Sequence, residues 1–265
     1  MTQDRGLLGS VRNAARVLRA FSQADMELGV TELAGRLGMG KSTTHRLVAT
    51  LAAERLLEQN PTTGKYRLGL ALYELGTKVT EHVDLHEAVL PVLTTLRHST
   101  GEMVHVAVLD GLSVVYVERL ESRHLLPVFR QVGHRIPAHW TSSGKVLLAA
   151  LPRDELLRRL AGVTLEPGTP RTISSIDVLI AELDRCAGRG WASNIEEGHE
   201  GVTSVGAPLR GPDGGVIAAV SVVGASSRVT GEAMHRYVNL VVEAASVISR
   251  RLGYRPDAMT RSRRR

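Results

Sequence analysis

The stretch from Val30 to Leu51, VTELAGRLGMGKSTTHRLVATL, limits the possible folds of this chain more than any other. Leu33 and Leu37 stand four residues apart, as on one face of an α-helix, and Thr31 stands where a side-chain cap would start that helix. The sequence Gly38-Met39-Gly40 then interrupts the pattern, because glycine adopts the positive φ that a sharp turn between helices often needs. We therefore expect two helices joined by a tight turn.

The second of these helices carries a polar cluster at its start. Its apolar positions, Leu47 and Leu51, would face the first helix, and its N-terminal turns are rich in basic and hydroxyl side chains. A helix-turn-helix protein presents such N-terminal turns to base edges and phosphates in the major groove of DNA. The residues of this motif that we expect to contact DNA are Thr31, Lys41, Ser42, Thr43, His45 and Arg46.

A phosphate-binding loop is an alternative interpretation of the same residues. Gly35–Ser42, GRLGMGKS, matches the pattern G-x-x-x-x-G-K-[ST], and the segment MVHVAVLD ending at Asp110 resembles a metal-binding strand. That loop must follow a β-strand, whose end directs the backbone amides at phosphate. Here Glu32, Leu33 and Ala34 precede the first glycine in a helical pattern. The context favours DNA binding, and a nucleotide hydrolase is the alternative.

The composition is that of a globular protein with one or two domains. The chain has 265 residues, of which 43% are hydrophobic, and a mean hydropathy near zero. Its single cysteine, Cys186, excludes an intrachain disulfide. It contains no run of about 18 apolar residues that could span a membrane, and the first residues lack the apolar core of a signal peptide. These features predict a cytoplasmic protein.

The charge is distributed unevenly along the chain. Residues 1–80 hold 11 Lys/Arg against 7 Asp/Glu, whereas residues 81–249 hold 15 against 19. Residues 250–265 hold 7 Arg and one Asp. A basic N-terminal region suits contacts with phosphates, which release counterions from DNA. The charge therefore supports DNA binding by the first part of the chain.

A short hairpin is predicted directly after the second helix. Two short strands, 56–58 and 65–68, flank a loop of Pro, Asn and Gly residues, as in the wing of a winged helix. Lys65 and Arg67 alternate to one side of the second strand. We expect these two side chains to meet the DNA backbone.

The rest of the chain mixes helices and strands. Apolar periodicity predicts helices over residues 10–21, 70–78, 85–101, 141–151, 176–189 and 234–252, and strands over 103–110, 111–120, 201–209 and 214–224. This mixture predicts an α+β fold with a mostly antiparallel sheet in the second domain. The expected organisation is a winged helix-turn-helix domain (1–68), a helical linker (69–84), an α+β domain (85–253) and a disordered basic tail (254–265).

In five segments along its sequence, the chain resembles the IclR (isocitrate-lyase-regulator) family of bacterial transcription factors. The carriers are TELAGRLGMGKSTTHRLVATL, YRLGLALYELG, VAVLDGLSVVYVERLES, VGHRIPAHWTSSGKVLLA and GAPLRGPDGGVIAAVSVVG, in that order. The resemblance implies a winged-helix DNA-binding domain and a GAF-like effector domain. It also implies a homodimer or a dimer of dimers that binds operator DNA as a repressor or activator, and a small organic acid or aromatic compound as the effector.

The resemblance further implies where the effector would bind. The matching positions in this chain are Ser142, Ser143, Gly144, Asn194, Ser204 and Ser221. Many members carry aspartate at the position of Asn194 and cysteine at that of Ser204, and Trp140 is larger than the usual residue there. The expected pocket is thus polar and uncharged at these positions.

The sequence also contains candidates for a Ser/Lys catalytic pair and for a metal site. Ser142 or Ser143 beside Lys145 resembles the Ser/Lys pair of some hydrolases, but no oxyanion hole or oriented base is evident from the sequence. The histidine pairs at 82/86 and 134/139 lack the third and fourth ligands of a zinc site. We therefore expect no catalytic residue, no metal and no cofactor, with a Ser/Lys hydrolase as a second alternative.

Overall fold

The computed structural model describes residues 8–22, 25–81, 85–122, 124 and 135–256. The chain divides into two compact units, Met1–His82 and Val83–Arg265. Each unit is described by itself.

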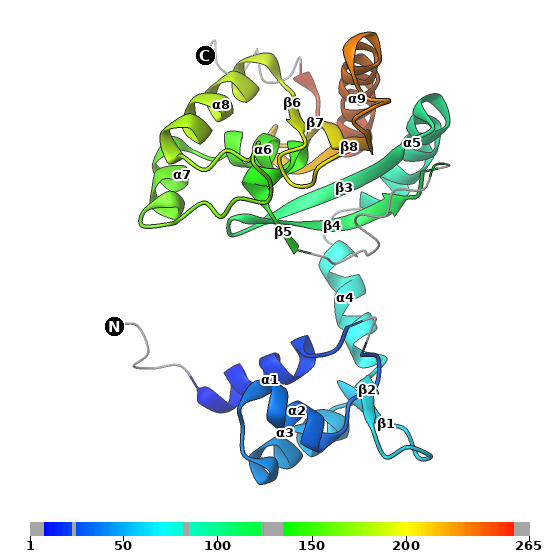
Figure 1. Ribbon diagram of the computed structural model, residues 1–265. Helices are drawn as coiled ribbons and strands as arrows, with labels where there is room; N and C mark the ends of the chain where they lie inside the picture. Colours follow the sequence, from blue (N-terminus) through cyan, green and yellow to red (C-terminus); the bar gives the residue numbers. More distant parts are fainter. Residues whose placement is uncertain (1–7, 23–24, 82–84, 123, 125–134, 257–265) are drawn as a thin grey trace. The chain divides into compact units, whose positions relative to one another are not determined.

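The first unit is three helices followed by a hairpin and a fourth helix (Figure 1). Its elements are α1 (Gly9–Arg19), α2 (Val30–Leu37), α3 (Lys41–Ala53), β1 (Leu57–Gln59), β2 (Tyr66–Leu68) and α4 (Ala71–Glu81). Its core contains Val17 from α1, Leu33 from α2 and Val48 from α3. Leu28, just before α2, exchanges two 2.9 Å backbone hydrogen bonds with Tyr66 and so ties this segment to the hairpin.

The start of α2 differs from the prediction. Thr31 is the second residue of the helix, and the N-cap is Gly29, whose N–H donates to Glu32 Oε2 at 2.7 Å. Glutamate at the third helical position reaches back in this way in a capping box, so a hydroxyl cap at Thr31 is not needed. The prediction that Thr31 caps α2 is wrong, and its exposed side chain stays free to meet a partner.

The buried face of α3 is also rotated from the predicted one. Leu51 is buried as expected, but Leu47 is only half-buried, and Thr44 and Val48 are fully buried. Four- and three-residue steps from Thr44 to Leu51 place these three side chains on one stripe of the helix.

The second unit is built on a six-stranded sheet in the order β5-β4-β3-β8-β7-β6. Its strands are β3 (Met103–Asp110), β4 (Ser113–Leu120), β5 (Arg135–Pro137), β6 (Ala192–Ile195), β7 (Val202–Arg210) and β8 (Val216–Ala225). Every neighbouring pair is antiparallel, which confirms the predicted sheet type. Strand β6, which is short, was not predicted.

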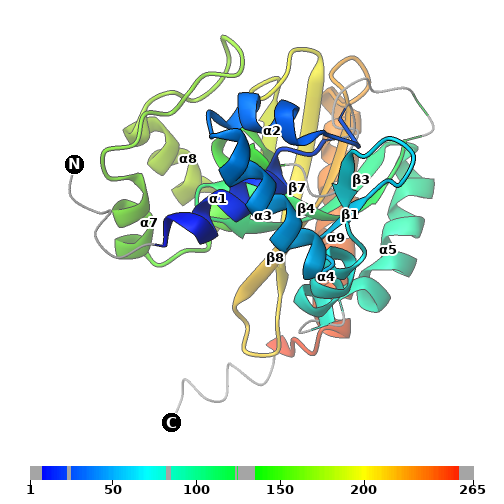
Figure 2. The ribbon, with the colours of Figure 1, turned by 90° about the horizontal axis from the view of Figure 1, so that it is seen from below.

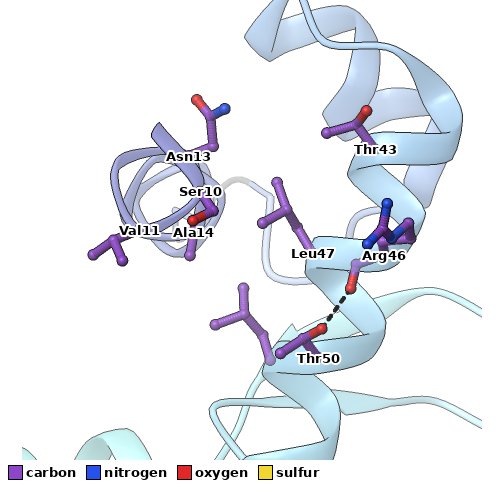
Figure 3. Close-up of a pocket in the computed structure, with 9 residues that line it drawn as sticks. Ser10, Val11, Asn13, Ala14, Thr43, Arg46, Leu47 and Thr50 are labelled. Carbon is purple, nitrogen blue, oxygen red and sulfur yellow. Dashed lines mark hydrogen bonds between the residues drawn. The ribbon is translucent and has the colours of Figure 1, made fainter. Parts of the chain in front are cut away.

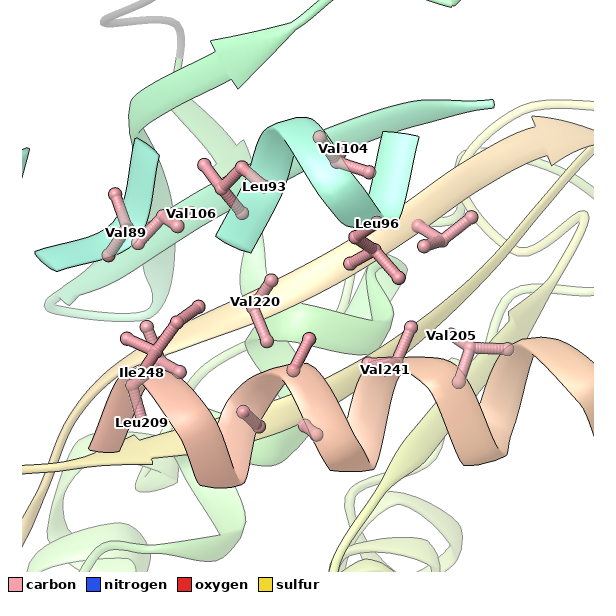
Figure 4. Packing of buried hydrophobic residues seen from close by; sticks show 14 of the residues in the cluster. Val89, Leu93, Leu96, Val104, Val106, Val205, Leu209, Val220, Val241 and Ile248 are labelled. Carbon is pink, nitrogen blue, oxygen red and sulfur yellow. The ribbon is translucent and has the colours of Figure 1, made fainter. Parts of the chain in front are cut away.

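Helices cover both faces of this sheet (Figures 1 and 2). On one side lie α5 (Leu85–Thr100) and α9 (Gly231–Arg251); on the other lie α6 (Ser142–Ala149), α7 (Arg153–Leu160) and α8 (Ile176–Arg189). Figure 4 shows the first core, where Val104 and Val220 from the sheet meet Leu96 of α5 and Val241 of α9. Because side chains alternate along a strand, the residues next to these valines on β3 and β8 point to the opposite face, which α6 covers.

Several predicted boundaries agree with the structure and others fall outside the described residues. Helix α8 spans the predicted residues and ends at Gly190, whose φ is 78°. Helix α5 contains Pro91 in its second turn. Of the tail predicted to be disordered (254–265), residues 257–265 lie outside the described residues, as do 82–84 of the predicted linker. The N–H of Tyr254, at the start of that tail, donates to the Ser249 carbonyl at 2.9 Å. None of the described helices combines the length and apolarity that a membrane span needs.

Candidate DNA-binding and effector-binding sites

The N-terminal turns of α3 form an exposed polar surface. The side chains of Lys41, Ser42, Thr43, His45 and Arg46 are all exposed. The helix beneath them is fixed by its buried stripe and by Thr44, whose hydroxyl donates to the Gly40 carbonyl at 3.1 Å. Neither Lys41 nor Arg46 forms an ion pair with any described residue. These side chains therefore remain available to a ligand, as base and phosphate contacts require.

The turn before α3 has the conformation predicted from its glycines. Gly38 has a φ of 64°, and the Met39 N–H donates to the Ala34 carbonyl at 3.0 Å. Gly35, the first residue of the phosphate-loop pattern, lies inside α2, and an isolated bridge at Leu28 is the only strand-like residue shortly before that helix in the described part of the chain. A phosphate-binding loop needs a strand directly before its first glycine. The structure gives the nucleotide-hydrolase alternative no support.

An open groove of about 530 Å³ runs between α1 and α3 (Figure 3). Leu47 points into it from α3, opposite Ala14 of α1. Thr43 and Arg46, also on α3, line it as well. The Thr50 hydroxyl donates to the Arg46 carbonyl at 2.8 Å, so the backbone of α3 is held on this side. The groove explains why Leu47 is only half-buried.

The wing carries its two predicted cations in ion pairs. Lys65 Nζ lies 3.2 Å from Glu32 Oε1, and Arg67 donates to both carboxylate oxygens of Glu58 at 2.9 and 3.2 Å. The backbone N–H of Gly29, and then Lys65, lower the pKa of Glu32, and Arg67 lowers the pKa of Glu58. Both cations are thus partly neutralised within the unit, which the sequence pattern did not indicate.

In the second unit, the start of α6 lies directly over strand β7. Thr141 is the N-cap of α6, and its hydroxyl accepts from the Gly144 N–H at 2.9 Å. Ser142 Oγ lies 2.8 Å from Ser204 Oγ on β7. A Cβ at Gly206 would stand 3.1 Å from the Ser142 backbone, so a larger residue there would require the start of α6 to shift away from β7. Because the N–H of Gly144 already donates to Thr141, this predicted effector contact is engaged within the protein.

Asn194 on β6 is also engaged within the protein. It lies opposite Ser204 in the sheet, and its Oδ1 accepts from the Glu197 N–H at 2.7 Å. This hydrogen bond closes the turn that follows β6. The structure thus brings Asn194, Ser142 and Ser204 together beneath α6, with polar atoms of each already bound to protein groups.

The other two predicted serines are buried without a partner. The hydroxyls of Ser143 and Ser221 make no hydrogen bond to any residue that the structure describes, and each residue is 1% exposed. The same holds for both ring nitrogens of His105 and for Nε and Nη1 of Arg119. Buried polar groups almost always have partners, so these atoms stand out among the polar groups of the second unit.

Three of these side chains, on β3, β4 and β8, share one rung of the sheet. His105 on β3 lies opposite Arg119 on β4 and opposite Ser221 on β8. Ser221 in turn lies opposite Gly206, over which α6 carries Ser143. Directly opposite residues point to the same face, and here that face is the one that α6 covers. We call Arg119, His105, Ser221 and Ser143 the orphan cluster.

Burial keeps the histidine of the orphan cluster neutral. Burial, and then the nearby Arg119 charge, lower the pKa of His105 to about 3. Its ring centroid lies 4.4 Å from that of Tyr116, whose pKa burial raises. A neutral imidazole has one N–H donor and one acceptor nitrogen. The cluster therefore contains two hydroxyls, a neutral imidazole and the guanidinium of Arg119, which is ion-paired with Glu121.

Sequence reasoning missed His105 and Arg119. A signal was present for His105, which stands between valines in the largely apolar segment MVHVAVLD, whereas Arg119 follows Glu118 at the polar end of SVVYVERL. Which face each occupies depends on the strand register, including a bulge between Val106 and Ala107, and this was not available from the sequence.

Lys145 is held in a buried ion pair. Its Nζ donates to both carboxylate oxygens of Glu197 at 2.6 and 2.9 Å, and the side chains are 2% and 12% exposed. Burial raises the pKa of Glu197, and Lys145 opposes that effect. A lysine that serves as a general base must be free to accept the proton of its nucleophile. This pairing gives the Ser/Lys hydrolase alternative no support.

The histidines form no metal site among the residues that the structure describes. No group of three His, Cys, Asp or Glu side chains in that part of the chain could hold an ion. His86 pairs with Glu118 at 2.6 Å, and His139 Nε2 lies 3.2 Å from the Glu166 carbonyl. The two other histidines of the predicted pairs, at 82 and 134, lie outside the described residues.

Comparisons with known proteins match both units. The model described as "IclR helix-turn-helix domain" matches residues 10–61, and "Bacterial transcriptional regulator IclR C-terminal" matches residues 77–250. The HTH-type transcriptional regulator XynR of Escherichia coli is 35% identical, over 94% of this chain and 98% of its own length. The glycerol operon regulatory protein of Streptomyces coelicolor is 33% identical, over 92% of this chain and 96% of its own.

Solved structures agree with this assignment. The Thermotoga maritima IclR superimposes with a TM-score of 0.74 at 30% identity, covering 92% of this chain and 99% of that one. An IclR homologue of Microbacterium hydrocarbonoxydans, in complex with 4-hydroxybenzoate, gives a TM-score of 0.81 at 26% identity, covering 92% and 98%. Both units, in this order and over nearly the whole chain, show that the protein belongs to the IclR family of bacterial transcriptional regulators.

Proposed function

We propose that residues 1–68 bind a specific operator duplex and that a small organic effector, bound by residues 85–253, changes the affinity for that duplex. The observation that supports DNA binding most directly is the exposed polar start of α3, where Lys41 and Arg46 form no ion pair with any residue in the described part of the chain. In a helix-turn-helix, this part of the second helix contacts base edges. Arginine and lysine contacts to guanine are the commonest specific ones, and each good pair discriminates by about 1–3 kcal/mol.

Lys41 and Arg46 are proposed to have different roles. Arg46, one turn into α3, reads a base edge together with His45, whereas Lys41 at the first helical position binds phosphate. Ser42, Thr43 and Thr31 add hydroxyls to the same surface. Lys65 and Arg67 of the wing reach the backbone only when the DNA phosphates replace their carboxylate partners, so their net contribution is smaller.

The test is a selection of duplexes from a random pool, followed by anisotropy titrations of the enriched sequence at several salt concentrations. Arg46→Ala should cost about 1–3 kcal/mol and relax the sequence preference. Lys41→Ala should weaken every duplex alike and reduce the salt slope by about one. Arg153→Ala, an exposed arginine of α7 in the other unit, is the control. Unchanged affinity in both α3 variants, or no enrichment of any sequence, contradicts the proposal.

Operator binding also requires a pair of DNA-binding units. One unit reads only a few base pairs, so a symmetric dimer on two half-sites supplies the specificity. Leu70, Tyr73 and Leu75, at and in α4, are 72%, 70% and 53% exposed, and apolar side chains so exposed suit a subunit contact. We propose that the protein is a cytoplasmic homodimer or a dimer of dimers, with residues 69–84 contributing to the contact.

The effector acts through linkage. A small molecule changes operator affinity only if it binds two conformations of the protein unequally. The operator must then change the affinity for that molecule by the same factor. Anisotropy titrations with saturating effector and calorimetric titrations of effector with saturating operator test this reciprocity. If the effector changes operator affinity by a different factor than the operator changes effector affinity, the proposed coupling is contradicted. The proposal includes no catalytic role.

A further inference from the structure

The wing, the hairpin of β1 and β2, is bound to the residues that precede and begin α2. Glu27 Oε1 accepts from Asn60 Nδ2 at 2.8 Å, and Glu27 Oε2 accepts from Thr63 Oγ1 at 3.1 Å. Next to Glu27, Leu28 exchanges its two backbone hydrogen bonds with Tyr66. The Glu27 carboxylate thus uses both of its oxygens to bind a loop that lies 33 to 36 residues further along the chain.

The partners of Glu27 are neutral groups of the wing loop. Asn60 Oδ1 also accepts from the N–H groups of Thr62 and Thr63, at 2.9 and 3.3 Å, so the side chain that Glu27 binds also shapes the loop. The hydrogen bond from Asn60 lowers the pKa of Glu27, so this carboxyl is ionised at neutral pH. An ionised acceptor forms stronger hydrogen bonds than a neutral one. Glu27 therefore holds the loop in place through hydrogen bonds to neutral groups.

Two other glutamates bind the cations of the wing. Lys65 pairs with Glu32, and Arg67 pairs with Glu58, which lies directly opposite it in the hairpin. These four side chains are 42–57% exposed, so DNA phosphates can reach them. Each carboxylate competes with phosphate for its cation, and its negative charge remains near the DNA after the exchange. The two pairs therefore lower the attraction of the wing for any duplex, whatever its sequence.

We propose, on the basis of the proposed DNA-binding function, that Glu27 is a positioning residue that fixes the wing for its contact with the DNA backbone, and that Glu32 and Glu58 limit the attraction of the wing for phosphate. A wing that is already fixed loses little conformational freedom when it binds. Because phosphate contacts carry no sequence information, weakening them leaves a larger share of the operator affinity to the base contacts of α3.

Glu27 should respond to loss of charge differently from the other two glutamates. DNA is an anion, so simple electrostatics predicts tighter binding when any acidic residue of this unit is removed. Glu27→Ala should instead lower operator affinity about two- to tenfold, as for one lost hydrogen bond, and flatten the salt slope because the wing contacts are lost. Glu27→Gln keeps an acceptor for Asn60 and gains a donor for the Thr63 hydroxyl, so it should bind the operator at least as tightly as the parent.

Removal of charge at the other two positions should tighten binding. Glu32→Gln keeps an acceptor for the Gly29 N–H at the start of α2, and Glu58→Gln keeps one for Arg67. Each should raise the affinity for the operator and for a scrambled duplex alike, by up to about fivefold, and steepen the salt slope by up to about one. Glu54→Gln is the matched control, because Glu54 is exposed at the end of α3 and pairs with no cation in the described part of the chain. Its effect should be smaller.

Anisotropy titrations of the full chain measure these affinities at several salt concentrations, for the enriched operator and for a scrambled duplex of the same composition. Far-UV circular dichroism measures the melting temperature of each variant. A partly unfolded variant loses active protein but keeps the salt slope of the parent, so the slope separates a misplaced wing from a misfolded unit. If Glu27→Ala does not fold, Thr63→Val removes one of the two hydrogen bonds from the exposed loop and should change affinity and slope in the same direction.

Three results would overturn the inference. They are operator affinity or a salt slope in Glu27→Ala equal to that of the parent, Glu27→Gln binding as weakly as Glu27→Ala, and Glu32→Gln and Glu58→Gln binding no tighter than Glu54→Gln. The proposed function fails separately, if the parent prefers no duplex or if Lys41→Ala and Arg46→Ala leave its affinity unchanged. If the parent discriminates between duplexes and the glutamate variants all match the control, the inference alone fails.

Discussion

The buried Lys145–Glu197 pair gives a quantitative prediction for the second unit. Lys145→Met removes one partner and leaves the Glu197 carboxylate in a site where only 12% of its side chain is exposed. Breaking a buried pair in this way costs about 3–5 kcal/mol. At about 2–4 °C per kcal/mol for a unit of this size, the melting temperature should fall by roughly 6–20 °C at pH 7. Tryptophan fluorescence follows the transition, because Trp140 and Trp191 report on this unit.

The acid side of the same prediction follows from Glu197. Its pKa is raised by burial already in the intact pair, and without Lys145 it rises further. A folded-state pKa above the unfolded value gives stability that is complete at low pH and is lost as the pH rises through the folded pKa. The deficit of Lys145→Met should therefore shrink as the pH falls from 7 toward the unperturbed glutamate pKa.

The double variant Lys145→Met/Glu197→Leu separates the pair from its surroundings. With both charges replaced by apolar groups of similar size, stability should return to within about 1–2 kcal/mol of the parent. If Lys145→Met melts within a degree of the parent, the pair is not holding the β6–β7 turn against α6. If the double variant is no more stable than Lys145→Met, an uncompensated buried charge is not the cause of the loss.

Three further predictions concern single positions. Gly38→Ala should destabilise the first unit by about 1–2 kcal/mol, because Gly38 has a φ of 64° that a residue with a Cβ adopts only with strain. Gly35→Ala, inside α2 and with open space around it, should stabilise the unit by up to about 1 kcal/mol. Melts followed by far-UV circular dichroism should therefore shift in opposite directions for the two variants. Leu70→Glu should lower the sedimentation coefficient by breaking a subunit contact, and an unchanged coefficient places that contact elsewhere. Glu118 raises the pKa of His86, so the parent should lose a small stability as the pH rises above 6.5, and a His86→Gln variant with the same pH dependence refutes this.

Local physical chemistry determined much of the first unit. Glycine at position 38 breaks the helical pattern because the chain must adopt a positive φ there, and the residues around it suffice to predict two helices. The same holds for α8, whose apolar period and terminal Gly190 define both of its ends. These features depend on neighbours within a few residues, so they are visible in the sequence.

Tertiary structure alone decided how the second unit uses its polar residues. Ser142 and Ser204 are 62 residues apart and bind each other only because α6 packs on β7 across Gly206. Arg119 and Ser221 lie on strands that meet through β3, in a register set by a bulge. Side chains alternate between the two faces of a strand, so a shift of one residue would turn each of them away from α6. Which serines are hydrogen-bonded, and which lie unbonded on the same face as Arg119, is therefore a property of the assembled sheet.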